Sequence, residues 1–163
     1  EPVKNPQRLI RAWSSAYGKL LLVGSGQLKE DLKNLIKELG LSDTIAIQPE
    51  TNDIGSLLSK AHALIISSDR EGSPKVLYES LYCKVPVLAT DCGNISEVLP
   101  KTSVADNNDE SFKILLKKWV PEVDKLSSIQ RDCFNRVGSN NLLSIQTEKV
   151  NMKYQEFLSM ASK

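Results

Sequence analysis

The sequence predicts an α/β fold in which a Rossmann-like, doubly wound parallel sheet precedes a helical tail. Short apolar runs alternate with longer segments of helical periodicity up to about Pro100. This alternation is typical of right-handed βαβ units, which build parallel sheets. Beyond that point the segments have only the amphipathic spacing of helices. We therefore expect one domain over residues 1–163, with tail helices over about 109–162.

Length and composition limit the classes of protein that fit. The 163 residues are 40% hydrophobic and 25% charged, which suits a globular domain with its own core. A net charge of +1 provides no overall field that would attract nucleic acid, so we expect no such partner. No apolar run reaches the roughly 18 residues that a membrane span needs. The three cysteines lack metal-site spacing, which favours a reducing, cytoplasmic compartment.

The chain is expected to begin with a helix and a strand. Leu9, Ile10 and Trp13 have helical spacing within residues 5–16. The continuous apolar run 20–23 predicts a strand of the kind that is buried on both faces of a parallel sheet.

A tight turn at Gly24 and Gly26 should lead from this strand into a second helix. That helix covers about 27–39, where Leu and Ile residues form an apolar stripe. The turn lacks the third glycine of a dinucleotide-binding fingerprint, because Lys29 occupies that position. We expect instead a turn in which a ligand can approach the backbone.

The remaining predicted strands are short apolar runs at 44–47, 63–67 and 85–89. Asp53 is placed to cap a helix that ends near Lys60. Further helices are expected at 74–82, 96–99, 109–119, 122–137 and 142–161.

The stretch from Glu71 to Glu79 carries the strongest chemical signal. It follows the strand 63–67, and ligands of open α/β sheets bind beyond the carboxyl ends of the strands. Ser73 can cap a helix whose first residue is Pro74. One carboxylate thus precedes the helix, and the other lies more than one turn inside it.

The start of this helix predicts an anion site that suits phosphate. The amides of Lys75, Val76 and Leu77 would be free, and the helix dipole favours negative charge there. Glu71 would face the same pocket, and Glu79 could accept hydrogen bonds from the two hydroxyls of a ribose. From spacing alone, the alternative that both are solvated carboxylates stays open.

Together with other segments at fixed separations, these residues resemble the carboxyl-terminal domain of retaining GT-B glycosyltransferases, in glycosyltransferase family 4. The resemblance covers roughly residues 1–118. The matching segments are Lys4-Asn5-Pro6, Leu21 to Gly26, Glu71-Gly72, Glu79, Val85 to Gly93 and Glu97-Val98. Two positions depart from the family pattern: Ser73-Pro74 replaces a common Phe-Gly, and Asn94 replaces a common glycine.

The resemblance implies a domain that binds a nucleotide-diphosphate sugar as donor substrate, with no metal and no cofactor. Glu71 would contact hydroxyls of the donor sugar, Lys4 the diphosphate and Glu79 the ribose. The candidate catalytic residues are therefore Glu71 and Lys4. The candidate donor-binding residues are Gly24, Gly26, Gly72, Ser73, Pro74, Lys75, Val76, Leu77 and Glu79.

The resemblance also implies that this chain is half of an enzyme. An acceptor domain, and the family arginine that partners Lys4, would precede residue 1, and the first strand would be truncated. The complete enzyme would transfer the sugar with retention to a glycan or lipid-linked acceptor, in cell-surface polysaccharide or lipopolysaccharide synthesis. It would be cytoplasmic, with peripheral association at the inner face of the cell membrane as an option.

Two other functions stay open. A non-catalytic nucleotide-binding or interaction domain of the same fold would keep the pocket without the transfer. A GT-B sugar-nucleotide epimerase fits less well, because those enzymes bring histidines to the donor half and His62 is the single histidine here. We expect His62 to be structural.

Overall fold

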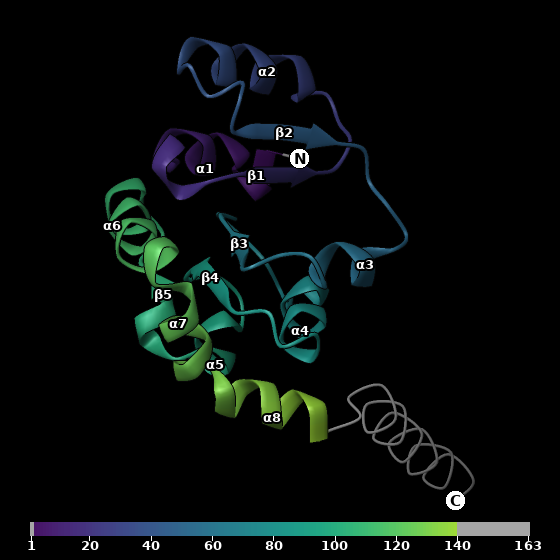
Figure 1. The fold of residues 1–163 in the computed structure, drawn as a ribbon, viewed down its shortest axis with the longest axis vertical. Coiled ribbons are helices and arrows are strands. Elements are labelled where there is room, and N and C mark those ends of the chain that lie inside the picture. Colours follow the sequence, from purple (N-terminus) through teal and green to yellow (C-terminus); the bar gives the residue numbers. More distant parts are fainter. Residues whose placement is uncertain (1, 140–163) are drawn as a thin grey trace, which may run out of the picture.

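The computed structural model describes residues 2–139, and every strand pair in that range is parallel (Figure 1). One sheet pairs β1 with β2, and the other has the order β3-β4-β5. The strands are β1 (Leu20–Val23), β2 (Ile45–Gln48), β3 (Leu64–Ile66), β4 (Val87–Thr90) and β5 (Val104–Ala105). The predicted parallel α/β architecture is confirmed. The described strands form two hydrogen-bonded sheets, however, so one edge of β1 and one edge of β3 are not hydrogen-bonded to another described strand.

Helices connect and cover the strands. The α-helices of the described range are α1 (Pro6–Ala12), α2 (Lys29–Glu38), α3 (Ile54–Leu58), α4 (Lys75–Tyr82), α5 (Ile95–Val98), α6 (Asp109–Trp119), α7 (Val123–Ile129) and α8 (Arg131–Ser139). Short 3-10 helices occupy Pro2–Lys4, Ser15–Tyr17, Lys101–Ser103 and Val120–Glu122. In Figure 1, α1 and α2 accompany the β1–β2 sheet, whereas α4, α5, α7 and α8 surround the second sheet.

Two predictions for the first elements need correction. The helix expected over 5–16 ends at Ala12, because Trp13 adopts an extended backbone (φ −76°, ψ 142°). The strand β1 is not buried on both faces, since Leu21 and Val23 remain 44% and 40% exposed. Leu20 belongs to the core with α1 and α2, so these helices cover one face of β1 and leave the other face open.

The tail also differs from its prediction. The single helix expected over 122–137 is divided into α7 and α8 at Gln130, whose side chain is completely buried. Its amide oxygen accepts the backbone N–H of Val87 at 2.9 Å. Its amide nitrogen donates to the Val87 carbonyl at 2.7 Å and to Ser103 Oγ at 2.8 Å. Gln130 thus extends the hydrogen bonding of β4 with a side chain. The helix predicted over 142–161 lies outside the described residues.

Two hydrophobic clusters form the core. The first joins α1, α2 and α6 to β1 and β2, and contains the fully buried Ile10 and Phe112. The second joins α4 and α8 to β3 and β4, and contains the fully buried Leu77 and Leu81. The first cluster also contains Leu88 of β4 and Ala105 of β5, so it reaches both sheets, whereas the second packs α4 against β3 and β4.

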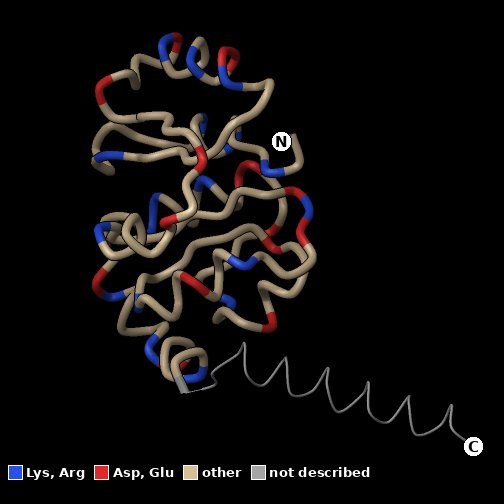
Figure 2. Tube along the Cα trace, turned by 90° about the vertical axis from the view of Figure 1, so that its right-hand side faces the viewer, with Lys and Arg blue, Asp and Glu red and all other residues tan. Residues whose placement is uncertain are grey.

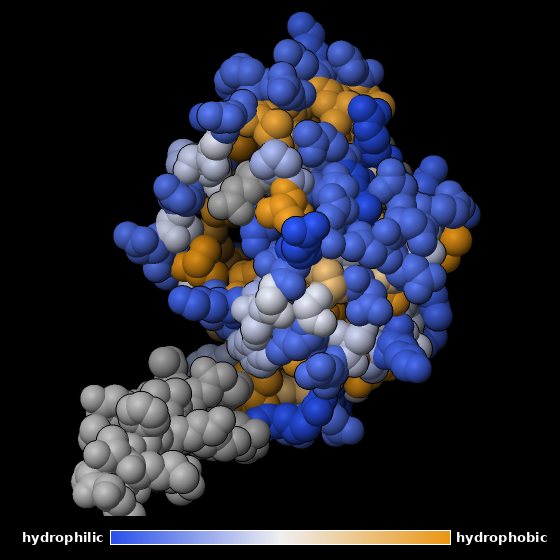
Figure 3. Space-filling view, turned by 180° about the vertical axis from the view of Figure 1, so that it is seen from behind, coloured by the Kyte–Doolittle hydropathy of each residue, from blue (hydrophilic) through white to orange (hydrophobic). Residues whose placement is uncertain are grey.

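The surface is of mixed character. Acidic and basic residues are interspersed along the trace (Figure 2). The face seen in Figure 3 is mostly hydrophilic, with apolar side chains in separate patches. Among the described helices, none has both the length and the apolar character to cross a membrane.

Candidate functional site

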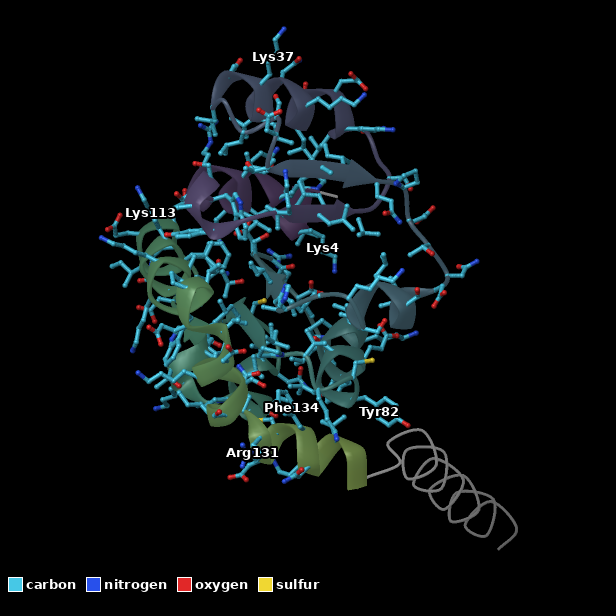
Figure 4. All side chains as sticks on the ribbon, in the orientation of Figure 1. Lys4, Lys37, Tyr82, Lys113, Arg131 and Phe134 are labelled. Atoms are coloured by element: carbon cyan, nitrogen blue, oxygen red, sulfur yellow. The ribbon has the colours of Figure 1, made fainter. Side chains whose placement is uncertain are left out.

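Lys4 and Glu71 come together although they are 67 positions apart in the sequence. Lys4 Nζ lies 2.7 Å from Glu71 Oε1 and 2.9 Å from Oε2. The lysine side chain is half exposed, whereas that of the glutamate is only 10% exposed. In Figure 4, Lys4 extends from the β1–β2 half of the molecule toward the half with β3 and α4. The two candidate catalytic residues therefore form one ion pair at the end of β3.

Hydroxyl groups behind the pair hold it in place. Ser67 Oγ donates to the backbone carbonyl of Lys4 at 3.0 Å. Ser68 Oγ donates to Glu71 Oε1 at 2.7 Å, and Thr90 Oγ1 donates to the Ser68 carbonyl at 2.6 Å. Ser67, Ser68 and Thr90 are all buried. The end of β3 thus positions both the lysine backbone and the glutamate carboxylate.

The start of α4 differs in detail from the prediction. The helix begins at Lys75, and Pro74 is its N-cap with an extended backbone (φ −69°, ψ 118°). Ser73 does not cap the helix, because its hydroxyl lies instead 3.4 Å from the hydroxyl of Tyr78. The free amide expected at Leu77 is also wrong, since that N–H donates to the Pro74 carbonyl at 3.1 Å.

Two amides at this helix start remain available. The N–H groups of Lys75 and Val76 have no hydrogen bond with another described residue. They follow Gly72 closely in the chain, and the Gly72 carbonyl accepts the N–H of Asn94 at 3.1 Å. An unpaired pair of amides at a helix N-terminus attracts an anion. Glu79 lies on the same helix with an exposed side chain.

The glycines after β1 belong to a different part of the sheet. Gly24 (φ 155°) and Gly26 (φ 151°) adopt backbone angles that favour glycine. The N–H of Gly24 donates to the Gln48 carbonyl at 2.9 Å, which ties the turn to β2. The N–H of Lys29 donates to the Gly26 carbonyl at 3.3 Å, so the hydrogen-bonded turn starts at Gly26, and the described hydrogen bonds do not bring it to Glu71.

Gly93 brings a second loop against the Glu71 loop. Its backbone is left-handed (φ 59°), and a Cβ atom there would collide with the Gly72 carbonyl oxygen and lie 2.8 Å from that of Glu71. Beyond it, Asn94 Nδ2 donates to the Tyr78 hydroxyl at 2.7 Å, which joins the loop to α4. The sequence analysis matched Gly93 to the family pattern without indicating this contact. Only its position after an apolar strand could have suggested it.

Replacing Gly93 with Ala should lower the free energy of unfolding by at least about 2 kcal/mol, because it combines a left-handed backbone with a clash against backbone atoms. Urea unfolding would measure the change. Gly55→Ala is the matched control, since Gly55 is helical and a Cβ there meets only Asp53 at 4.0 Å. Equal stability of the two variants would contradict the predicted contact.

Cys92 lies directly before this loop and is buried. Burial raises the pKa of its thiol, the nearby Glu71 carboxylate raises it further, and the Thr90 hydroxyl opposes the shift. A raised pKa keeps the sulfur protonated at neutral pH, so Cys92 is not a thiolate nucleophile.

Comparison with known proteins shows which family this chain belongs to. Residues 1–130 match the family model described as glycosyl transferases group 1. The chain belongs to this family. One relative of this chain is an uncharacterized glycosyltransferase of Haemophilus influenzae. It is 33% identical over 89 residues, which cover 52% of this chain and 25% of the relative.

Another relative is the N-acetylgalactosamine-N,N'-diacetylbacillosaminyl-diphospho-undecaprenol 4-alpha-N-acetylgalactosaminyltransferase of Campylobacter jejuni. It is 37% identical over 90 residues, covering 54% of this chain and 25% of the relative. The O-antigen chain mannosyltransferase of Salmonella typhimurium is 26% identical over 133 residues, covering 78% of this chain and 36% of the relative. The chain spans about a quarter of the length of the first curated relatives it matches (25% and 27%).

Solved structures establish the fold. Sucrose-phosphate synthase from Thermosynechococcus elongatus superposes with a TM-score of 0.82 at 18% identity, over 98% of this chain and 44% of that one. The HepE protein of Anabaena, solved with UDP and glucose, superposes with a TM-score of 0.79 at 18% identity, over 95% of this chain and 46% of that one. The chain thus has the Rossmann-like fold of GT-B glycosyltransferases.

Proposed function

We propose that this chain is the donor-binding half of a retaining glycosyltransferase of glycosyltransferase family 4. It binds a nucleotide-diphosphate sugar, and a separate acceptor-binding domain presents a glycan or lipid-linked acceptor. The names of its relatives, in O-antigen and amylovoran biosynthesis, support a role in cell-surface polysaccharide or lipopolysaccharide synthesis. The UDP and glucose bound to HepE support a sugar nucleotide as the donor.

The contact between Lys4 and Glu71 beside the free amides of α4 carries this proposal. A cation and two amides suit a diphosphate, whereas a carboxylate suits the hydroxyls of a sugar. A sugar linked to a diphosphate presents both groups next to each other. In the structure, Lys4 Nζ and Glu71 Oε1 lie 2.7 Å apart. A donor would separate them, with phosphate binding Lys4 and hydroxyls binding Glu71.

The proposed chemistry follows from where charge develops. Breaking the bond between sugar and diphosphate leaves positive charge on the sugar and negative charge on the diphosphate. Lys4 and the amides of Lys75 and Val76 would stabilise the leaving group, which is the kind of fixed charge complementarity that lowers barriers most. Glu71 would orient the sugar through its hydroxyls. Glu79, exposed on the next turn of α4, would accept hydrogen bonds from the ribose.

Calorimetric titration with UDP, GDP and ADP sugars tests the donor site, and Glu79→Gln tests the ribose contact. We expect Glu79→Gln to weaken binding about tenfold, because hydrogen bonds to a charged group contribute about 1.5–3 kcal/mol. The variant should also lose the preference for a ribonucleotide over its 2′-deoxy analogue. Glu38→Gln, an exposed glutamate at the end of α2, is the control. Wild-type chain that binds none of the three donors would refute the proposed function.

A further inference from the structure

A buried arginine lies behind the candidate site. Arg8 belongs to α1, and its side chain is only 7% exposed. Each nitrogen of its guanidinium has an acceptor: Nε bonds Asp109 at 2.8 Å, Nη1 bonds Asn107 Oδ1 at 2.7 Å, and Nη2 pairs with Asp69 at 2.9 Å. A charge is buried at little cost only when its hydrogen bonds are satisfied in this way.

The partners of Arg8 come from two other segments of the chain. Asp69 follows β3, whereas Asn107 and Asp109 lie between β5 and the first turn of α6. Arg8 Nη1 also approaches the Ser67 carbonyl at 3.4 Å. Asn107 Nδ2 donates to the backbone carbonyl of Asp69 at 2.7 Å, which closes the network. Arg8 therefore fastens α1 to the carboxyl ends of β3 and β5 at the same time.

Asp69 is the point at which this network meets the candidate site. Its N–H donates to the Val3 carbonyl at 2.8 Å, and its carboxylate accepts Asn5 Nδ2 at 3.1 Å. Val3 and Asn5 flank Lys4, and Asp69 lies two residues before Glu71. The same residue is thus bonded to both neighbours of the candidate lysine and joined by a short loop to the candidate glutamate.

We propose that Arg8 is a positioning residue that fixes the spacing of Lys4 and Glu71 for the donor; this inference rests on the proposed function. Arg8 does not contact Lys4 or Glu71 itself, and it acts through Asp69. Without the guanidinium, two carboxylates would lose their shared cation, and the loop after β3 could shift relative to Lys4. A lysine would keep the charge but not the planar fork that reaches three acceptors.

Arg8→Lys, Arg8→Met and Asn107→Ala test the inference in the chain as described. We expect each variant to weaken UDP binding about tenfold or more, because a misplaced charge-assisted hydrogen bond to phosphate loses most of its strength. Hydrogen exchange, followed by mass spectrometry well below the melting temperature, should accelerate in peptides covering 2–8 and 67–72. Exchange in α2 should stay unchanged, whereas a role in stability alone would raise exchange throughout.

The control variants distinguish a positioning role of Arg8 from an effect of its charge alone and from an effect on overall stability. Arg11→Met removes an exposed arginine from the same helix and should leave affinity and exchange as in the wild type. Arg8→Lys should recover the melting temperature more than the affinity. If Arg8→Met does not fold, the results for Arg8→Lys and Asn107→Ala test the inference. Wild-type affinity and exchange in these two would overturn the inference. If the wild-type chain binds no UDP, GDP or ADP, the proposed function fails, and local exchange still decides whether Arg8 holds the pair.

Discussion

Replacing Lys4 with Met is expected to lower kcat/KM of the intact enzyme by about 100- to 1,000-fold, the usual loss when one fixed donor to a developing negative charge is removed. The ammonium group is the cation that contacts Glu71 in this chain, at 2.7 Å. Without it, the diphosphate would leave with less stabilisation. A transfer assay with the cognate donor and acceptor measures the loss. We expect both a higher KM and a lower kcat, because the donor diphosphate is charged before the bond breaks and gains further charge as it breaks.

Two further variants sharpen this expectation. Lys37→Met removes an exposed lysine from α2, far from Lys4 in Figure 4, and should leave the rate unchanged. The double variant of Lys4→Met with Glu71→Gln should lose less activity than the two single losses multiplied, because groups in direct contact act together. Retention of more than half of the activity by Lys4→Met would remove Lys4 from the mechanism.

Replacing Gln130 with Leu should lower the free energy of unfolding by at least about 3 kcal/mol, because it leaves three buried polar groups unpaired at about 1–3 kcal/mol each. These groups are the N–H and carbonyl of Val87 and the Ser103 hydroxyl. Burial of the leucine side chain at this position compensates for only part of the lost stability. Urea unfolding measures the change.

The control for this prediction is Gln27→Leu, the same substitution at an exposed position. Surface changes of this kind usually alter stability by less than about 0.5 kcal/mol. A shift for Gln130→Leu no larger than that of the control would show that the hydrogen bonds to β4 contribute little. Gln130→Glu should also destabilise, because the carboxylate cannot donate to the Val87 carbonyl.

The repeating patterns of the sequence predicted most of the described fold. Apolar runs located β1 to β4 and periodic leucines located α2 and α6, because burial of a face imposes that spacing. The division of the tail at Gln130 was missed, because nothing local distinguishes a glutamine that bonds a distant strand from one in solvent. The same holds for the two-residue strand β5, which carries no pattern of its own.

For the candidate site, the sequence named candidate residues but not the contacts that hold them. Glu71 came from its place between a strand and a helix and Lys4 from the family resemblance, and the structure brings the two into contact. Ser73 was given a capping role from its residue type, yet its hydroxyl lies against Tyr78. Arg8 was not predicted, because the acceptors of its guanidinium lie 59 or more positions away in the chain. Contacts of that range are set by how the strands meet, which local spacing does not encode.

The division of the strands into two sheets bears on how the chain behaves in concentrated solution. β1 has no described strand on one side, and its Leu21 and Val23 side chains are 44% and 40% exposed. A free edge presents unpaired N–H and carbonyl groups that another strand can join, and apolar side chains reinforce the joining. We therefore expect copies of this chain to self-associate through β1 in concentrated solution, and a strand paired with this edge should prevent that association.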